Sequence, residues 1–155
     1  MLDREGVRKA LSEVNFATDG ADLQALAECY TEDVVFQRRD EVIRGREAFL
    51  AFFTARGSGK PRDPNRPHRP KLRHHMTSCK IDIVSPTEAR AQTYYMMVRP
   101  NGLDQTGMYR DTLRKVDGRW LVAHRIVEVY WGSAALLARE PELAAIGVHS
   151  PPAGA

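Results

Sequence analysis

The chain has 155 residues, of which 43% are hydrophobic and 28% charged, a composition typical of one globular domain with its own core. No apolar run approaches the roughly 20 residues that a membrane-spanning helix needs, and the charged N-terminus lacks the apolar stretch of a signal peptide, so we expect a cytoplasmic protein. Seven basic residues and one acidic residue between Arg56 and Arg73 account for more than the net charge of +3, which argues against a nucleic-acid-binding face.

Helices are predicted near the N-terminus and long strands after them. Apolar residues first recur at spacings of three and four, as on one face of a helix, and Asp19-Gly20-Ala21-Asp22 then ends that helix and caps a second. The expected elements are a helix at 3–18, a helix at 23–30, strands at 34–36 and 41–43, a helix at 46–55, strands at 72–84, 88–99, 106–116 and 119–130, and a short helix at 133–139. Asp117-Gly118 joins the last two strands as a tight hairpin turn. Helices followed by an antiparallel sheet indicate an α+β fold.

Two segments are expected to lie apart from the packed elements. Residues 57–71 contain four prolines and most of the basic cluster, so they cannot form a helix interior or a central strand. We interpret them as an exposed loop; a lid over a pocket and a polyproline-type partner segment are the alternatives. Residues 1–140 would then form one domain that includes this loop, and residues 141–155 a C-terminal tail.

Four segments follow one another in an order that is known from other proteins. They are Asp19–Leu26, Ile43–Ala48, Arg73–Ser78, and Gly107–Asp111 followed by Asp117–Trp120 and Arg125. These segments resemble the aspartate turn, the third-helix entry, the histidine strand and the closing hairpin of the SnoaL-like or scytalone dehydratase-like family, which belongs to the nuclear transport factor 2-like superfold. The resemblance covers about residues 5–130 and implies a cone-shaped, curved antiparallel or mixed sheet wrapped around the N-terminal helices, with a blind pocket for a small molecule.

The resemblance also implies an aspartate and a histidine that meet inside the cone. They fall on Asp19 and His74, and an arginine of the last strand falls on Arg125. An imidazole suits proton removal near neutral pH, and a carboxylate at its far nitrogen fixes its tautomer. Arg125 would stabilise an enolate, an oxyanion or a leaving group. The alternative for Asp19 is a purely structural role as the cap of the second helix.

Only one of the two adjacent histidines can enter the cone, because neighbouring strand residues point to opposite faces. Strict alternation puts His75 on the side of Ile81 and Ile83, whereas the family match favours His74. A β-bulge between the histidines and the isoleucines would reverse the face and place His74 inside. Because the two imidazoles point apart, they cannot share a metal ion, and we expect neither a metal nor a cofactor.

The closing hairpin brings further polar residues together. A two-residue turn at Asp117-Gly118 predicts that Asp111 lies opposite His124, as a structural ion pair or as a second acid–base pair. In this register Arg125 lies on the face opposite His124 and reaches the cone only if its strand is bulged.

Aromatic side chains are the remaining candidates for the pocket wall. The substrate-contacting residues that we expect are Phe16, Tyr30, Tyr94, Tyr109, Asp111 and Trp131. Apolar residues lie on both faces of the strand at 88–99, which indicates that one face lines the pocket and the other an interface in a homodimer or homotrimer.

The expected function is that of a cofactor-free lyase or isomerase, dehydratase- or cyclase-like, acting on a small, cyclic, mostly apolar molecule. The sequence has Thr93, Tyr94 or Met97 where relatives carry a second histidine or acid, which favours a non-catalytic small-ligand-binding or accessory protein as an alternative. A second alternative, the structural small subunit of a ring-hydroxylating dioxygenase, would have a long extended N-terminal arm that this sequence does not show.

Overall fold

The computed structural model describes residues 2–56 and 72–150 of the chain. The predicted basic loop at 57–71 therefore lies outside the described residues. The described part contains α1 (Leu2–Gly20), α2 (Leu23–Glu28), β1 (Tyr30–Arg38), β2 (Glu41–Arg44), α3 (Arg46–Ala55), β3 (Arg73–Ser85), β4 (Glu88–Arg99), β5 (Gly102–Val116), β6 (Arg119–Gly132), α4 (Ala134–Arg139) and α5 (Glu142–Ala145).

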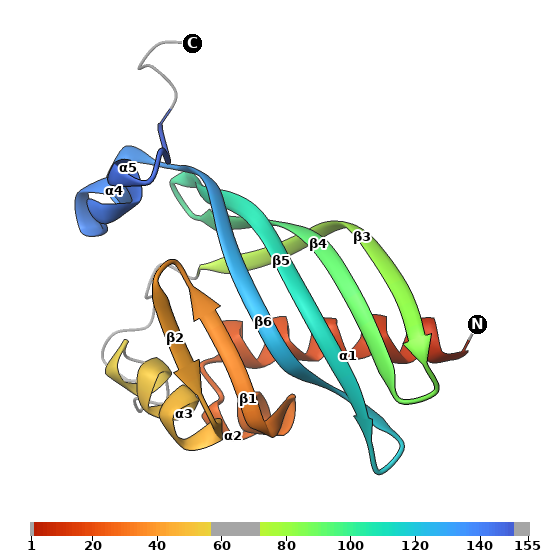
Figure 1. Cartoon of the computed structure of the whole chain (residues 1–155). Helices are drawn as coiled ribbons and strands as arrows, with labels where there is room; N and C mark the ends of the chain where they lie inside the picture. The colour runs from red at the N-terminus through yellow and green to blue at the C-terminus, as the bar shows by residue number, and fades with distance from the viewer. Residues whose placement is uncertain (1, 57–71, 151–155) are drawn as a thin grey trace.

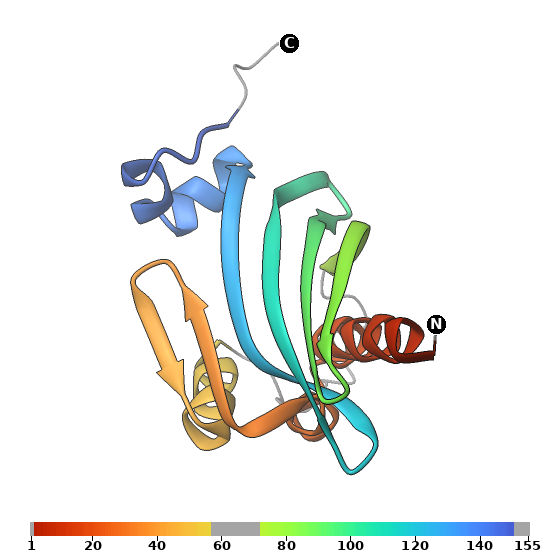
Figure 2. The same cartoon turned by 45° about the vertical axis from the view of Figure 1, so that its right-hand side comes forward.

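The described strands form one curved, mixed sheet in the order β2-β1-β6-β5-β4-β3, in which the β1–β6 pair is parallel and the other pairs are antiparallel. Figure 1 shows α1 lying across one face of this sheet, and Figure 2 shows how the strands bend around that side. We call this the inner face. The expected α+β class, with a sheet wrapped around the N-terminal helices, is confirmed.

The main core fills the space between α1 and the inner face. The predicted apolar stripe of α1, which is Val7, Ala10, Leu11 and Val14, is buried against inward residues of the long strands. Tyr30 was expected at the end of the second helix, but α2 ends at Glu28 and Tyr30 begins β1. The run of aromatic and β-branched residues that starts at Tyr30 favours a strand, and Tyr30 packs its ring 4.4 Å from that of Phe49.

Among the register shifts of the sheet, two decide the face on which the predicted residues His74 and Arg125 lie. In β3, Thr77 and Ser78 together face a single residue of β4, so Met76 and Cys79 lie on the same face despite their odd spacing. In β6, Ala123 is the extra residue, because Leu113 pairs with Val122 whereas Thr112 pairs with His124. Each bulge reverses the inside–outside alternation of the strand that carries it.

The strand register aligns the inward side chains in rows across the sheet. The first row contains His74, Met97 and Gln105; the second contains Met76, Tyr95 and Gly107; a deeper row contains Ile81, Ala91, Asp111 and Arg125. Gly107 leaves space for its neighbours, because a Cβ atom there would lie 1.9 Å from the Glu128 carbonyl oxygen and 2.7 Å from the Tyr95 hydroxyl.

The C-terminal helices form a small cap at the end of β6. Ion pairs join this cap to the tip of the β1–β2 hairpin: Arg38 bonds Glu140 at 2.6 Å, and Arg39 bonds both Glu140 and Glu142. The stretch 141–155 was assigned to a tail; among its described residues, α5 is helical and Leu143 is fully buried. Residues 151–155 lie outside the described part.

Burial of three tyrosines makes the fold sensitive to alkali. Burial raises the pKa of Tyr30 to about 12, and it raises the pKa values of Tyr95 and Tyr109 as well. A phenol whose pKa is higher in the folded state stabilises the fold fully below about pH 10, and this contribution is lost as the pH rises through the folded pKa. In an alkaline titration, we expect these three phenols to ionise only as the circular dichroism of the fold disappears. Complete ionisation of all five tyrosines at unchanged circular dichroism would contradict this expectation.

Candidate functional site

Asp19 and His74 meet on the inner face, where the last turn of α1 reaches the start of β3. Asp19 Oδ1 lies 2.6 Å from His74 Nδ1, and the backbone N–H of His74 donates to the two oxygens of the same carboxylate at 3.3 and 3.1 Å. Only 7% of the His74 side chain and 14% of the Asp19 side chain are exposed. A carboxylate beside Nδ1 favours a proton on that nitrogen, so Nε2 becomes the hydrogen-bond acceptor of the ring.

The capping alternative for Asp19 is wrong. Asp19 lies inside α1, which continues to Gly20, and the N-cap of α2 is Asp22. The Asp22 carboxylate accepts a hydrogen bond from the Ala25 N–H at 3.0 Å, so the cap position is taken by another residue.

The bulge at Thr77 and Ser78 brings His74, not His75, to the inner face. His75 is exposed on the outer face. Ile81 lies on the same side as His74 because the extra residue of the bulge reverses the alternation between them. The conflict between strict alternation and the family match is thereby removed.

Arg125 also points inward, through the bulge at Ala123, but it pairs with Asp111. Its Nε and Nη2 donate to the two Asp111 oxygens at 2.7 and 2.9 Å, and both side chains are almost wholly buried. Burial alone would lower the pKa of Arg125, but the attraction of Asp111 and the hydrogen bond to it, together with the nearby Tyr30 and Tyr109, outweigh that cost and raise its pKa above the ordinary value. The predicted pairing of Asp111 with His124 is wrong by one residue, because Ala123 shifts the register.

The structure does not bring Arg125 into contact with His74. The row of Asp111 and Arg125 lies six residues along β5 from the row that contains His74, a distance of about 20 Å along an extended strand. The Arg125 guanidinium instead lies 4.2 Å from the centre of the Tyr109 ring. Tyr109 stacks on Tyr95 with ring centres 4.3 Å apart, so a continuous stack leads from Arg125 toward the second row.

Two of the predicted wall residues are exposed and do not face the inner side. Phe16 is 81% exposed on the outer side of α1, and Tyr94 is 52% exposed on the outer face of the sheet. Alternation along β4 places the neighbouring Tyr95 inside. The sequence held a signal for this choice, because Ala89 and Ala91 alternate with charged and polar residues at the start of the strand and predict that odd-numbered residues point inward.

The other predicted wall residues are at least partly covered. Tyr30, Tyr109 and Asp111 are buried. Trp131 pairs with Thr106, on the outer side of β5, and is half-buried near the C-terminal cap, where it forms a bridge with His149. Gln105 is a buried polar residue of β5 that is not among the predicted site residues. Its signal was its even spacing from Tyr109 and Asp111, which puts it on their side of β5.

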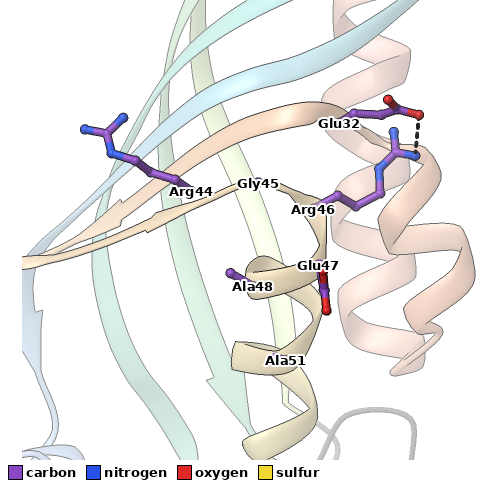
Figure 3. Close-up of a pocket in the computed structure, with 7 residues that line it drawn as sticks. All are labelled: Glu32, Arg44, Gly45, Arg46, Glu47, Ala48 and Ala51. Carbon is purple, nitrogen blue, oxygen red and sulfur yellow. Dashed lines mark ion pairs between the residues drawn. The ribbon is translucent and has the colours of Figure 1, made fainter.

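An open groove of about 610 Å³ lies elsewhere, at the start of α3. Figure 3 shows Ala48 and Ala51 on the helix and the side chains of Glu32 and Arg46 directed toward each other, 3.9 Å apart. The lining residues are Glu32, Arg44, Gly45, Arg46, Glu47, Ala48 and Ala51. None of the predicted site residues is among them, so this groove is not the predicted blind pocket.

Neither a membrane span nor a clustered metal site is found in the described part of the chain. No helix among residues 2–56 and 72–150 is long and apolar enough to cross a membrane. In the same ranges, no three histidine, cysteine or acidic side chains gather closely enough to hold one metal ion.

Solved structures share the fold of this chain at low sequence identity. A variant of Rv3472, a protein of unknown function from Mycobacterium tuberculosis, has a TM-score of 0.74 and 21% identity, over 93% of this chain and 88% of that one. A nuclear transport factor 2-like protein with a cystatin-like fold from Novosphingobium aromaticivorans has a TM-score of 0.66 and 21% identity, over 88% and 87% of the two chains. A candidate scytalone dehydratase from the same organism has a TM-score of 0.68 and 20% identity, over 83% and 84%.

These likenesses establish a nuclear transport factor 2-like fold and, at such identities, nothing about chemistry. No curated protein matches the sequence. The sequence itself matches the SnoaL-like domain over residues 1–126, which is most of its length. The chain therefore belongs to the SnoaL-like domain family.

Proposed function

We propose that this protein is a cofactor-free lyase or isomerase in which His74 is the general base and Asp19 orients it. The observation that carries the proposal is the 2.6 Å contact between Asp19 Oδ1 and His74 Nδ1 on the largely buried inner face. Such a contact fixes the orientation and tautomer of the ring, so that Nε2 carries the lone pair that takes a proton from a substrate. Acid–base chemistry of this kind needs no bound metal or organic cofactor.

The proposed reaction begins with removal of a proton from a substrate carbon. Nε2 of His74 takes the proton, and the electron pair of the broken C–H bond forms a double bond or an enolate. In an elimination, the leaving oxygen departs with its bonding electrons and receives the proton from Nε2, so water is released. In an isomerisation, Nε2 returns the proton to another carbon of the same molecule.

The surroundings of His74 favour a small, mostly apolar substrate. Met97 lies beside it in the same row, and Met76 and Tyr95 occupy the next one. A solved structure of the same fold is described as a candidate scytalone dehydratase, and the elimination that we propose is the reaction class that this description names. In this proposal Arg125 does not touch the reacting atoms; it is a positioning residue that orders the Tyr109–Tyr95 stack.

Proton exchange on a simple cyclic ketone tests the proposal without knowledge of the natural substrate. 1-Tetralone incubated with the protein in D₂O should gain deuterium at the carbon next to its carbonyl faster than in buffer, as followed by mass spectrometry. Intact-protein mass spectrometry under native conditions would also reveal a small molecule carried through purification. A bound molecule that is never converted, together with no exchange above buffer, would select the non-catalytic binding function instead.

The outer face of the sheet supports the further proposal that two copies of the chain associate. Tyr94 of β4 and Tyr130 of β6 are half-exposed there, and an Arg110–Glu128 ion pair with a 2.6 Å bond joins β5 to β6 on the same face. Tyr94→Asp should convert a dimer into a monomer in size-exclusion chromatography with light scattering, because a charge would have to be buried. Phe16→Asp, at an exposed site on α1, is the matched control and should leave the dimer intact. An unchanged dimer in the Tyr94 variant would contradict this interface.

A further inference from the structure

Gln105 combines deep burial with an unsatisfied hydrogen-bond acceptor. Gln105 is only 5% exposed. Its Oε1 has no hydrogen-bond partner among residues 2–56 and 72–150. Its Nε2 contacts the Met97 sulfur. A thioether can only accept, so this contact requires the NH₂ group on the Met97 side and leaves the oxygen as the free acceptor. Buried acceptors without partners are uncommon in folded proteins and call for an explanation.

The position of Gln105 relates it directly to the proposed catalytic pair. His74 pairs with Met97 across β3 and β4, and Met97 pairs with Gln105 across β4 and β5. Residues that pair directly share one face, so all three side chains point inward. Two inter-strand spacings separate the Cα atoms of His74 and Gln105 by about 10 Å. The imidazole and the carboxamide therefore flank Met97 on the same side of the sheet.

The other polar group close to His74 on this face is already bonded. The Tyr95 hydroxyl, in the second row, donates to the Glu128 carbonyl oxygen at 3.1 Å. Within the first two rows, the Gln105 oxygen is thus an acceptor available to a ligand in addition to His74 Nε2, which the proposed reaction uses. Met97 is half-buried and unbranched, and its rotatable side chain can swing aside when a ligand enters between its two neighbours.

We propose that Gln105 is the specificity-determining residue of this site and that the substrate is a ring compound bearing a hydroxyl or N–H group. Gln105 Oε1 accepts a hydrogen bond from that group, the apolar ring replaces Met97 between the two polar residues, and the carbon that loses its proton lies at His74 Nε2. This inference rests on the proposed function for the role of His74. Recognition by Gln105 can be measured separately from turnover.

A matched pair of probes tests this recognition. 2-Naphthol carries a hydroxyl donor, whereas 2-methoxynaphthalene has a similar ring without one. Titrations followed by the Met97 methyl resonance should show that the wild-type protein binds 2-naphthol at least about tenfold more tightly. Gln105→Leu should remove this preference while 2-methoxynaphthalene still binds. Gln92→Leu, the same substitution at an exposed position of β4, should keep the preference.

Several outcomes would overturn the inference. Equal affinities of the wild-type protein for the two probes, an undiminished preference in a folded Gln105→Leu variant, or no binding of either probe would each do so. Gln105→Met provides a second variant if the leucine variant does not fold. His74→Ala should retain the preference for 2-naphthol. If the preference holds but His74→Ala keeps full exchange activity, the proposed function fails and the recognition role of Gln105 stands.

Discussion

His74→Ala is expected to lower the enzyme-catalysed deuterium exchange of 1-tetralone by about 10²- to 10⁴-fold, the usual contribution of a general base. Asp19→Asn should cause a loss of the same order, because a neutral amide can no longer stabilise the imidazolium and no longer favours the proton on Nδ1. Both side chains are largely buried and bonded to each other. Exchange rates measured by mass spectrometry, with circular dichroism to verify folding, check both variants.

Neighbouring residues of the same type provide the controls for this prediction. His75→Ala alters an exposed imidazole on the outer face, and Asp22→Asn keeps a residue type that caps helices well. Both variants should retain the wild-type exchange rate. Full activity in folded His74→Ala and Asp19→Asn variants would refute the acid–base proposal. A comparable loss in His75→Ala would show that the assay responds to damage of β3 and not to a specific base.

Asp111→Ala is expected to lower the free energy of unfolding by about 3–5 kcal/mol, because it leaves the Arg125 charge buried without its partner. The two side chains are almost wholly shielded from water and share two hydrogen bonds, of 2.7 and 2.9 Å. Urea denaturation followed by circular dichroism measures the change. The double variant Asp111→Leu with Arg125→Met should recover most of the loss, since it removes both buried charges together.

An exposed ion pair on α1, away from the proposed dimer face, calibrates this stability effect. Lys9→Ala breaks the pair with Glu13, in which the two charged atoms lie 3.7 Å apart and water and salt replace much of the interaction, and it should cost far less than Asp111→Ala. If Asp111→Ala destabilised the protein no more than Lys9→Ala, the buried pair would not be a major stabilising element of the inner face.

Much of the fold could be predicted from local sequence patterns. The stripe of apolar residues in α1 identified a helix with one buried face, and Asp117-Gly118 identified the hairpin turn; Asp117 and Gly118 have the positive φ angles, 49° and 78°, that such turns need. The end of α2 was misjudged at Tyr30, because its apolar ring suits the buried side of either a helix or a strand. Packing against Phe49 decides between them, and that contact is not local in sequence.

The candidate site was less predictable, because it depends on how strands pair. Asp19 and His74 are 55 positions apart, and only the resemblance to a family connected them. The bulge at Ala123 moved Asp111 from His124 to Arg125, and no local pattern in Leu121–Arg125 signals an extra residue there. Gln105 lies just before the strand predicted at 106–116, whereas β5 begins at Gly102, so no face of the sheet was predicted for it. Its burial follows from its place next to Met97 and the cap.

Because of the bulge in β3, the face on which His74 lies depends on the number of residues between His74 and Ile81. Thr77 and Ser78 point to solvent, and their identities can change without affecting which face His74 occupies. Deletion of one of them would remove the bulge. Because the core would keep Ile81 in place, the part of β3 before the deletion would present its opposite face to α1. The His74 imidazole would then point away from Asp19 into water. The loss of a single residue at this point would therefore separate Asp19 from His74 while leaving the architecture intact, whereas a substitution of Thr77 or Ser78 would leave the two in contact.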